Sequence, residues 1–288
     1  MKYFYHQYQN ELELFIDQAI NEDLGEVDHS SKATISKMYI KEAVLIVKEN
    51  CSIAGVELSK QIFKRFDPTI EFRQIHKDGD KLNTGDQVFV VKGKAISILA
   101  MERIVLNCMQ RMSGTATLTN KLVTKISHTN CVLLDTRKTT PNFRYPQKWA
   151  VLIGGGSNHR MGLFDELMIK DNHIDYCGGI SEALEKTEKY ISKLKTSYPV
   201  VVETRSILEV KEALKYSWIE RILLDNMDID MLLESISLVG NKFPLEASGN
   251  INESNIVSIA ETGVNYVSMG CLTHSSMPID LSLKVFNN

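Results

Sequence analysis

The sequence predicts an α/β protein in two parts, the second being a small closed barrel of parallel strands. Up to about residue 95, helix-like and strand-like segments are mixed. From Cys131 onward, six short apolar runs recur, and helical patterns separate the later ones, which is typical of parallel strands with crossover helices. A polar or charged residue follows every run. In a β/α barrel these strand ends meet on one face, whereas an open doubly wound sheet gathers them at one switch point.

Five segments and a long helix make up the first part. Apolar periodicity, Gly-Asp turns and the break at Asp67-Pro68 define them. The predicted segments are a helix over 10–22, a strand over 40–48, a helix over 55–66, and strands over 69–75 and 87–91. The helix that follows is predicted over 95–127, with a break near Ser113-Gly114, and it leads into the second part.

Six strands are predicted in the second part, fewer than the eight of the standard barrel. They cover residues 132–134, 167–169, 200–202, 222–224, 245–247 and 266–269. Helical patterns over 206–215 and 252–262 separate the later strands. The residues that follow the strands begin at Asp135, Lys170, Glu203, Asp225, Ser248 and Gly270. We expect these residues to surround one active site.

Composition excludes several classes of protein. The chain has 288 residues and a formal net charge of −3, which argues against the basic surface of a nucleic-acid protein. No apolar run reaches the roughly 18 residues of a membrane span, and the N-terminus lacks the apolar stretch of a signal peptide. The five cysteines are scattered without a C-x-x-C pair, as in reduced proteins, where each is usually a small buried hydrophobe. We expect a cytoplasmic protein.

Two segments have the residue types that bind anions. The segment 135–141 joins Arg137 and Lys138 to three threonines, and cations with hydroxyls suit carboxylate or phosphate. A solvated basic loop is an equally acceptable interpretation of this segment. The segment 154–160 has three glycines before His159 and Arg160, so its backbone can approach a ligand closely. A flexible connection is its alternative interpretation.

The remaining strand ends allow several kinds of chemistry. Lys170 could form a Schiff base, contact an anionic ligand or pair with a nearby acid. Glu203 and Asp225 could hold Mg²⁺ with ligand phosphates, or accept hydrogen bonds from ribose hydroxyls. The small residues at 248–250 and 270–275, with His274, suit a phosphate, although turn and N-cap roles explain them as well.

Several motifs together resemble the quinolinate phosphoribosyltransferase family. They are Met-Glu-Arg-Ile-Val-Leu-Asn (101–107), Asp-Thr-Arg-Lys-Thr-Thr-Pro (135–141), Gly-Gly-Gly-Ser-Asn-His-Arg-Met-Gly-Leu (154–163), Ile-Lys-Asp-Asn-His-Ile (169–174), Leu-Leu-Asp-Asn-Met (223–227), Glu-Ala-Ser-Gly-Asn-Ile (246–251) and Leu-Thr-His-Ser (272–275). The resemblance spans nearly the whole chain. It implies an N-terminal α/β sandwich-like domain and a C-terminal six-stranded α/β barrel, the type II phosphoribosyltransferase fold. We expect domains over 1–113 and 114–288, and allow the last residues to return to the N-terminal domain.

The resemblance also implies an activity and a set of site residues. The reaction joins quinolinate to phosphoribosyl pyrophosphate, gives nicotinate mononucleotide, pyrophosphate and CO₂ in NAD biosynthesis, and requires Mg²⁺. The implied enzyme is a homodimer in which one subunit's N-terminal domain covers the other's barrel mouth. The implied roles are substrate binding for Arg103 (across the interface), Arg137, His159 and Arg160; substrate contacts in catalysis for Lys138 and Lys170; ribose and Mg²⁺ contacts for Glu203 and Asp225; and 5′-phosphate contacts for Ser248, Gly249, Gly270 and His274.

Departures from the family pattern and competing functions define what has to be tested. Val-Asp-His-Ser (27–30) replaces a Gly-Asp-x-Thr motif, and Thr204-Arg205 follows Glu203 where many members differ. The competing functions are a paralogue with another acceptor such as nicotinate, a metal-transport-associated homologue, a Schiff-base lyase or aldolase that uses Lys170, and a non-catalytic binding protein. A dicarboxylate clamp of Arg103, Arg137, His159 and Arg160 favours quinolinate.

Overall fold

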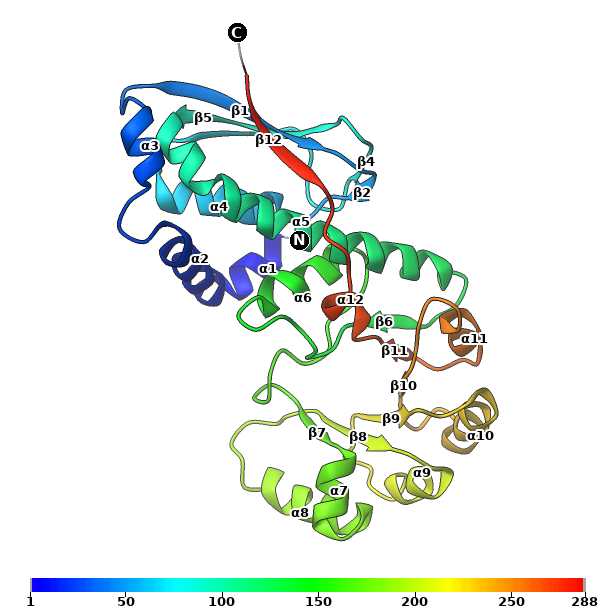
Figure 1. The fold of residues 1–288 in the computed structure, drawn as a ribbon. Coiled ribbons are helices and arrows are strands. Elements are labelled where there is room, and N and C mark those ends of the chain that lie inside the picture. The colour runs from blue at the N-terminus through cyan, green and yellow to red at the C-terminus, as the bar shows by residue number, and fades with distance from the viewer. Residues whose placement is uncertain (1, 287–288) are drawn as a thin grey trace. The chain divides into compact units, whose positions relative to one another are not determined.

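A computed structural model describes residues 2–286 (Figure 1). The chain forms two compact units. The first unit contains residues 1–120, 139–155 and 272–288, and the second contains residues 121–138 and 156–271. Among the described residues, no helix combines the length and apolar composition that crossing a membrane would need.

The first unit is built on a four-stranded antiparallel sheet in the order β12-β1-β5-β3. Its strands are β1 (Ile40–Val47), β3 (Glu71–Gln74), β5 (Gln87–Lys94) and β12 (Leu281–Val285), and β2 (Cys51–Ser52) pairs separately with β4 (Lys81–Leu82). Figure 1 shows β12, in red, along β1, with Ala43 opposite Val285 and Val47 opposite Leu281. The last strand of the chain therefore completes the sheet of the first unit.

The first unit also contains helices. They are α1 (Lys2–Gln7), α2 (Gln9–Leu24), α3 (His29–Thr34), α4 (Val56–Phe66), α6 (Arg144–Ile153), α12 (Cys271–His274) and the first part of α5 (Ala95–Lys125). Phe63 of α4, Phe72 of β3 and Phe89 of β5 form one aromatic cluster, in which the rings of Phe72 and Phe89 lie 4.5 Å apart. The predicted helices at 10–22 and 55–66 and the strands at 40–48, 69–75 and 87–91 are confirmed within a few residues.

The break predicted at Ser113-Gly114 is wrong, because α5 is continuous over 31 residues. Ser113 is fully buried, and its hydroxyl contacts both the N–H and the C=O of Ala54 at 3.0 and 3.2 Å. A Cβ on Gly114 would lie 2.0 Å from the Met277 carbonyl oxygen. The two small residues therefore allow close packing of α5 rather than a break in it.

The second unit contains six parallel strands in the order β6-β11-β10-β9-β8-β7, which confirms the predicted strand number and positions. They are β6 (Val132–Leu134), β7 (Leu167–Ile169), β8 (Val200–Thr204), β9 (Arg221–Asp225), β10 (Leu245–Ser248) and β11 (Tyr266–Ser268). In the described residues β6 and β7 are not paired with each other, and a single bridge joins Leu134 to Ser157. Glu203 on β8 pairs in register with Leu223, and Asp225 on β9 with Ser248 on β10, so their carboxyl ends meet along one edge.

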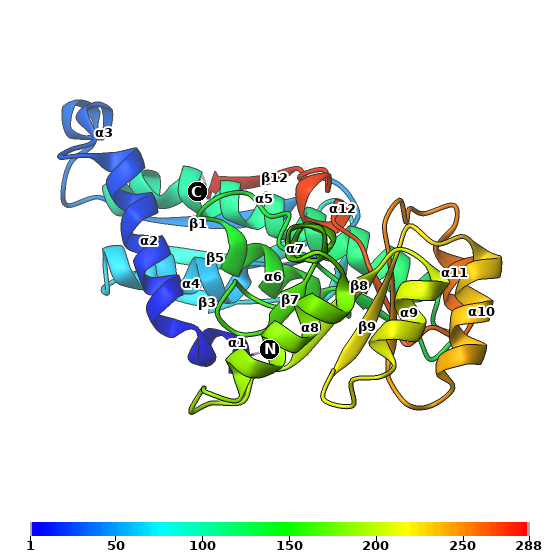
Figure 2. The same cartoon turned by 90° about the horizontal axis from the view of Figure 1, so that it is seen from below.

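Helices lie between the strands from β7 onward in the chain (Figure 2). They are α7 (Asp171–Cys177), α8 (Ile180–Ile191), α9 (Ile207–Ala213), α10 (Ile229–Val239) and α11 (Ile256–Glu261). The helices predicted over 206–215 and 252–262 correspond to α9 and α11. Helix α9 has α8 and α10 as neighbours, and α10 begins at an N-cap in which Asp228 accepts a hydrogen bond from the Met231 N–H at 2.9 Å.

Both departures from the family pattern have local structural roles. Asp28 is the N-cap of α3 and accepts a hydrogen bond from the Ser31 N–H at 3.0 Å. The Thr204 hydroxyl donates to the Leu223 carbonyl at 3.0 Å, and Arg205 forms ion pairs with Asp175 and Glu209 at 2.9 and 3.0 Å. These residues therefore stabilise α3 and the surroundings of α7 and α9.

Candidate functional site

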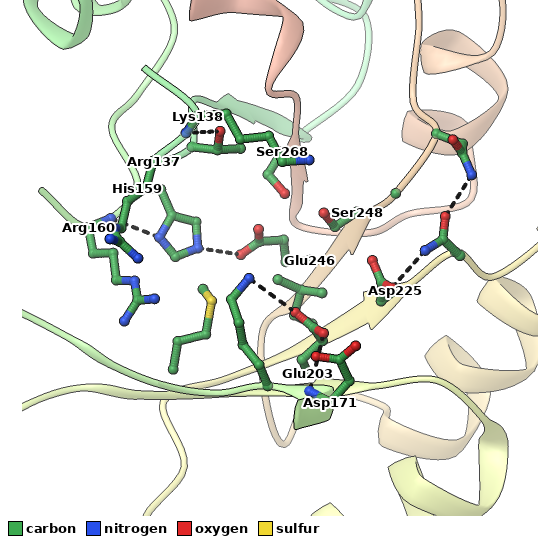
Figure 3. A pocket seen from close by; sticks show the side chains of 17 residues that line it. Arg137, Lys138, His159, Arg160, Asp171, Glu203, Asp225, Glu246, Ser248 and Ser268 are labelled. Carbon is green, nitrogen blue, oxygen red and sulfur yellow. Dashed lines mark hydrogen bonds and ion pairs between the residues drawn. The ribbon is translucent and has the colours of Figure 1, made fainter. Parts of the chain in front are cut away.

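A cavity of about 630 Å³ lies at the carboxyl ends of the strands of the second unit (Figure 3). Along β7, β9 and β10, lining residues are spaced by two, because alternate side chains of a strand point to the same face. Met168 and Lys170, Leu223 and Asp225, and Glu246 and Ser248 are three such pairs. The predicted site residues that line it are Arg137, Lys138, His159, Arg160, Lys170, Glu203, Asp225, Ser248 and Gly249.

Three predicted site residues do not line this cavity. Arg103 is exposed on α5 in the first unit. His274 lies on α12, also in the first unit, and its Nδ1 is 2.5 Å from the Ser275 hydroxyl. Gly270 follows β11 in the second unit, outside the lining residues. Their proposed roles stay predictions.

Arg137, Lys138 and Arg160, here called the cationic side, come from irregular segments (left in Figure 3). Arg137 and Lys138 follow β6, where the buried Asp135 accepts hydrogen bonds from the His159 N–H at 2.9 Å and the Asn158 side chain at 2.6 Å. Burial, together with the nearby Arg137, lowers the pKa of Arg160. Two guanidinium groups that repel each other in a partly buried site are suited to an anion with more than one charge.

Glu203 and Asp225, here called the carboxylate side, lie at the carboxyl ends of the adjacent strands β8 and β9. Burial raises the pKa of Glu203, the charge of Asp225 raises it further, and Lys170 opposes the shift. The Lys170 Nζ lies 3.7 Å from Glu203, and the lysine side chain is 45% exposed. This is the arrangement of a paired cation rather than of the desolvated amine that Schiff-base chemistry uses.

Asp225 is held by Asn226, which is itself held by Asn250, and neither asparagine is among the predicted site residues. The Asn226 side chain donates to Asp225 Oδ2 at 2.7 Å and accepts from the Asn250 side chain at 2.9 Å. Both asparagines have positive φ, 55° and 50°. Gly249 has a φ of 88°, and a Cβ there would lie 2.3 Å from Asn226 Oδ1. The packing of Asn226 therefore requires glycine at position 249, independently of any contact between Gly249 and a ligand.

Beneath the cationic side lies a buried cluster of His159, Glu166, Arg221 and Glu246. Glu246 Oε2 lies 2.9 Å from Arg221 Nε and 3.3 Å from His159 Nε2, and Glu246 is fully buried. The Arg221 N–H directions miss the carboxylate, so this contact is an ion pair rather than an aligned hydrogen bond. Glu166 Oε1 lies 3.3 Å from His159 Nδ1, and Glu166 Oε2 lies 3.3 Å from Arg221.

Sequence reasoning missed Glu166, Arg221 and Glu246 as site residues. Two signals were available. Charged residues are rarely fully buried unless paired, so an acid within the apolar run Leu245-Glu246-Ala247 indicates a buried partner. Spacing by two from Ser248 also gives Glu246, and spacing by four from Asp225 gives Arg221, so both lie on the inner face of their strands.

Two carboxylates at strand ends, Glu203 and Asp225, form the candidate donor set for a metal ion. Across residues 2–286, no group of three or more His, Cys, Asp or Glu side chains is arranged to hold a metal. Glu203 and Asp225 nonetheless match Mg²⁺, which proteins usually bind through one or two carboxylates together with substrate phosphates. Repulsion between these two carboxylates, which contributes to the raised pKa of Glu203, would be relieved by a bound cation.

Comparison with known families and curated proteins gives consistent matches over the chain. The family described as quinolinate phosphoribosyl transferase matches with its N-terminal domain over residues 28–113 and with its C-terminal domain over residues 115–284. A nicotinate-nucleotide pyrophosphorylase (carboxylating) from Oryza sativa is 44% identical, over 96% of this chain and 78% of that protein. A quinolinate phosphoribosyltransferase (decarboxylating) from Nicotiana tabacum is 45% identical, over 94% and 81%.

Solved structures agree with the sequence matches. The nicotinate-nucleotide pyrophosphorylase from Francisella tularensis superposes with a TM-score of 0.88 at 37% identity, over 96% of both chains. The enzyme of the same name from Ehrlichia chaffeensis gives 0.87 at 34% identity, over 94% of this chain and 97% of that one. Both family domains are matched, and nine of the predicted site residues line one cavity. This chain therefore belongs to the quinolinate phosphoribosyltransferase family.

Proposed function

We propose that the protein is a quinolinate phosphoribosyltransferase. It transfers the phosphoribosyl group of phosphoribosyl pyrophosphate to the nitrogen of quinolinate and releases pyrophosphate and CO₂. The product is nicotinate mononucleotide, a precursor of NAD. Family membership supports this assignment, and the single observation that carries it is one cavity with cations on one side and two strand-end carboxylates on the other. The cations suit the carboxylates of a pyridine dicarboxylate, and the two carboxylates suit a ribose with its phosphates.

The cationic side binds quinolinate in this proposal. Arg137 and Arg160 are the guanidinium donors for its carboxylates, and fork-shaped guanidinium groups bind carboxylates in a fixed orientation. Lys138 and Lys170 add positive charge between quinolinate and the pyrophosphate. These groups hold the pyridine nitrogen towards the anomeric carbon, and such orientation of two reactants lowers the barrier without a protein nucleophile.

The carboxylate side binds the ribose in this proposal. Glu203 and Asp225 accept hydrogen bonds from the ribose hydroxyls and would hold Mg²⁺ together with the pyrophosphate. When bound, Mg²⁺ would neutralise charge that develops on the leaving pyrophosphate. Positive charge at the sugar favours nearby carboxylates, and positive charge on the alkylated pyridine nitrogen favours loss of the adjacent carboxylate as CO₂. Ser248 and Gly249 contact the 5′-phosphate.

Assembly and location belong to the same proposal. The family resemblance supports a homodimer in which Arg103, exposed on α5, reaches the partner's cavity, with Gly270 and His274 near the 5′-phosphate. All five cysteines are free thiols, which supports a reducing compartment such as the cytoplasm. The Oryza sativa relative is named as chloroplastic and one Nicotiana tabacum relative as mitochondrial, so those compartments are the alternatives to test.

One assay tests the proposed function. Purified protein is incubated with quinolinate labelled in the 2-carboxylate, phosphoribosyl pyrophosphate and Mg²⁺, and released CO₂ and nicotinate mononucleotide are measured together. We expect the two products in equal amounts. Nicotinate replaces quinolinate in a parallel reaction, which identifies a paralogue with another acceptor. Turnover with nicotinate alone, or no product from either acceptor, would refute the proposal.

A further inference from the structure

The buried cluster contains two acids and one permanent cation, so its charge depends on where protons are held. Glu246 is fully buried and Glu166 is largely buried, while Arg221 is the cation between them. Burial acts to raise the pKa of Glu246, but contacts with His159 and Arg221 outweigh it and lower that pKa. Burial raises the pKa of Glu166 despite the same two neighbours. Glu246 is thus the ionised acid, and Glu166 is the one that retains a proton more easily.

The contacts of His159 select one tautomer of its ring. The Arg160 backbone N–H donates to His159 Nδ1 at 2.8 Å, so Nδ1 is an acceptor. Because Nδ1 accepts, the other nitrogen, Nε2, carries the proton. It lies 3.3 Å from both Glu246 Oε2 and the Arg221 guanidinium, and of these two neighbours only the ionised Glu246 can accept from it. Arg160 is held at a second point, because its guanidinium donates to the Glu166 carbonyl oxygen at 3.1 Å.

These contacts link Glu246 on β10, through His159, to Arg160 on the cationic side. We propose that Glu246 is a positioning residue that fixes His159 as the Nε2–H tautomer, so that Nδ1 holds the Arg160 backbone where its guanidinium can bind a carboxylate of the pyridine dicarboxylate. Glu246 lines the cavity, but in this proposal it acts through His159 rather than by contact with the reacting atoms. The inference deepens the proposed function and rests on it for the identity of the ligand, but the tautomer itself can be tested without any substrate.

The kinetic test compares the two substrates in Glu246→Gln. We expect the KM for quinolinate to rise about tenfold or more, the size of effect that loss of one charge-assisted contact gives. The KM for phosphoribosyl pyrophosphate should stay within about twofold, because Glu203 and Asp225 are untouched. The control is Glu253→Gln, which removes an exposed acid of the same unit that pairs with Lys121 and Lys125 at 2.7 and 2.9 Å. We expect wild-type constants for the control. An unchanged quinolinate KM, or an equal rise for both substrates, would overturn the inference.

A double-mutant cycle separates positioning through His159 from a general structural role. His159→Asn keeps an acceptor near Nδ1 but removes the contact with Glu246. If Glu246 acts through His159, adding Glu246→Gln to His159→Asn changes the quinolinate KM no further. If the two effects multiply instead, Glu246 acts by another route and the inference fails. If Glu246→Gln does not fold, Glu246→Asp takes its place, because it retains the charge beside Arg221 and shortens the reach to His159.

A spectroscopic test needs no turnover. Protein labelled with ¹⁵N-histidine is observed by NMR, and the His159 signals are identified by their loss in His159→Asn. We expect the neutral Nε2–H tautomer in the wild type and a mixture of tautomers in Glu246→Gln. A wild-type ring protonated only at Nδ1 would contradict the inference even if the enzyme is active. If the protein does not use quinolinate, the proposed function fails, and this spectrum alone decides the positioning of His159.

Discussion

The two sides of the cavity are built differently. Glu203 and Asp225 end regular strands whose register fixes where they point. Arg137, Lys138 and Arg160 lie on irregular segments, where side-chain hydrogen bonds fix the backbone: Asp135 accepts from the His159 N–H, and Asp165 accepts from the N–H groups of Met161 and Gly162. The cavity therefore has two sides with different kinds of support, so a change on one side should affect one substrate more than the other.

The largest effect should come from the carboxylate side. Asp225→Asn removes a charge that faces the ribose and Mg²⁺, and we expect kcat/KM for phosphoribosyl pyrophosphate to fall by about 10²- to 10³-fold, as for other preorganised electrostatic contacts. Steady-state kinetics with each substrate varied in turn measures it. Asp228→Asn is the control, because Asp228 caps α10 outside the cavity and asparagine is also a good N-cap. A fall in kcat/KM confined to quinolinate would contradict the assignment of phosphoribosyl pyrophosphate to the carboxylate side.

Arg137→Ala is the matching change on the cationic side. We expect the KM for quinolinate to rise by about 10- to 100-fold, the range for loss of a hydrogen bond to a charged group. Binding of phosphoribosyl pyrophosphate should be comparatively intact, which equilibrium titration of this substrate measures directly. Arg205→Ala provides the control, since Arg205 is exposed and pairs with Asp175 and Glu209 away from the cavity. An equal loss of binding for both substrates would contradict the assignment of quinolinate to the cationic side.

The support of Asp225 can be tested through stability. Alanine at Gly249 meets both a positive φ and the Asn226 side chain, whereas Gly263 has a φ of 99° with no atom within 4 Å of its would-be Cβ. We expect Gly263→Ala to lower the free energy of unfolding by about 1 kcal/mol and Gly249→Ala by about 3 kcal/mol. Urea unfolding of both variants measures the difference. Equal costs would show that Asn226 can move away from Gly249, and that it does not hold Asp225 firmly.

The smallest effect concerns pH on the cationic side. Because burial raises the pKa of Glu166, this acid stays protonated to a higher pH than an ordinary glutamate. As the pH rises through that raised pKa, a second buried negative charge appears beneath the cationic side, and we expect the KM for quinolinate to increase about two- to fivefold. Glu166→Gln stays neutral at every pH, so the increase should disappear from its pH profile. A profile identical to that of the wild type would exclude Glu166 as its source.

The sequence predicts the carboxylate side of the cavity better than the cationic side. The strand ends at Glu203, Asp225 and Ser248 could be predicted, because short apolar runs followed by polar residues identify the edge of a parallel sheet. Spacing by two could have added Glu246 and Arg221. The irregular segments have no such period, so no pattern indicated that Asp135 and Asp165 hold their backbones, or that the Arg160 N–H meets His159 Nδ1.

Elements that depend on packing between residues far apart in the sequence could not be predicted either. Ser113-Gly114 is a typical helix-breaking pair, yet contacts with Ala54 and the close approach of Met277 keep α5 continuous. The strand β12 pairs with β1 across more than 230 residues of sequence, and no local signal specifies such a partner. Tertiary contacts override local preference at both places.

The central claim is that the two sides of the cavity bind different substrates, and a crystal structure of the protein with quinolinate alone tests it most directly. We predict that both quinolinate carboxylates lie within hydrogen-bond distance of the guanidinium groups of Arg137 and Arg160, and that neither contacts Glu203 or Asp225. Quinolinate bound against Glu203 and Asp225, or outside the cavity, would contradict the account.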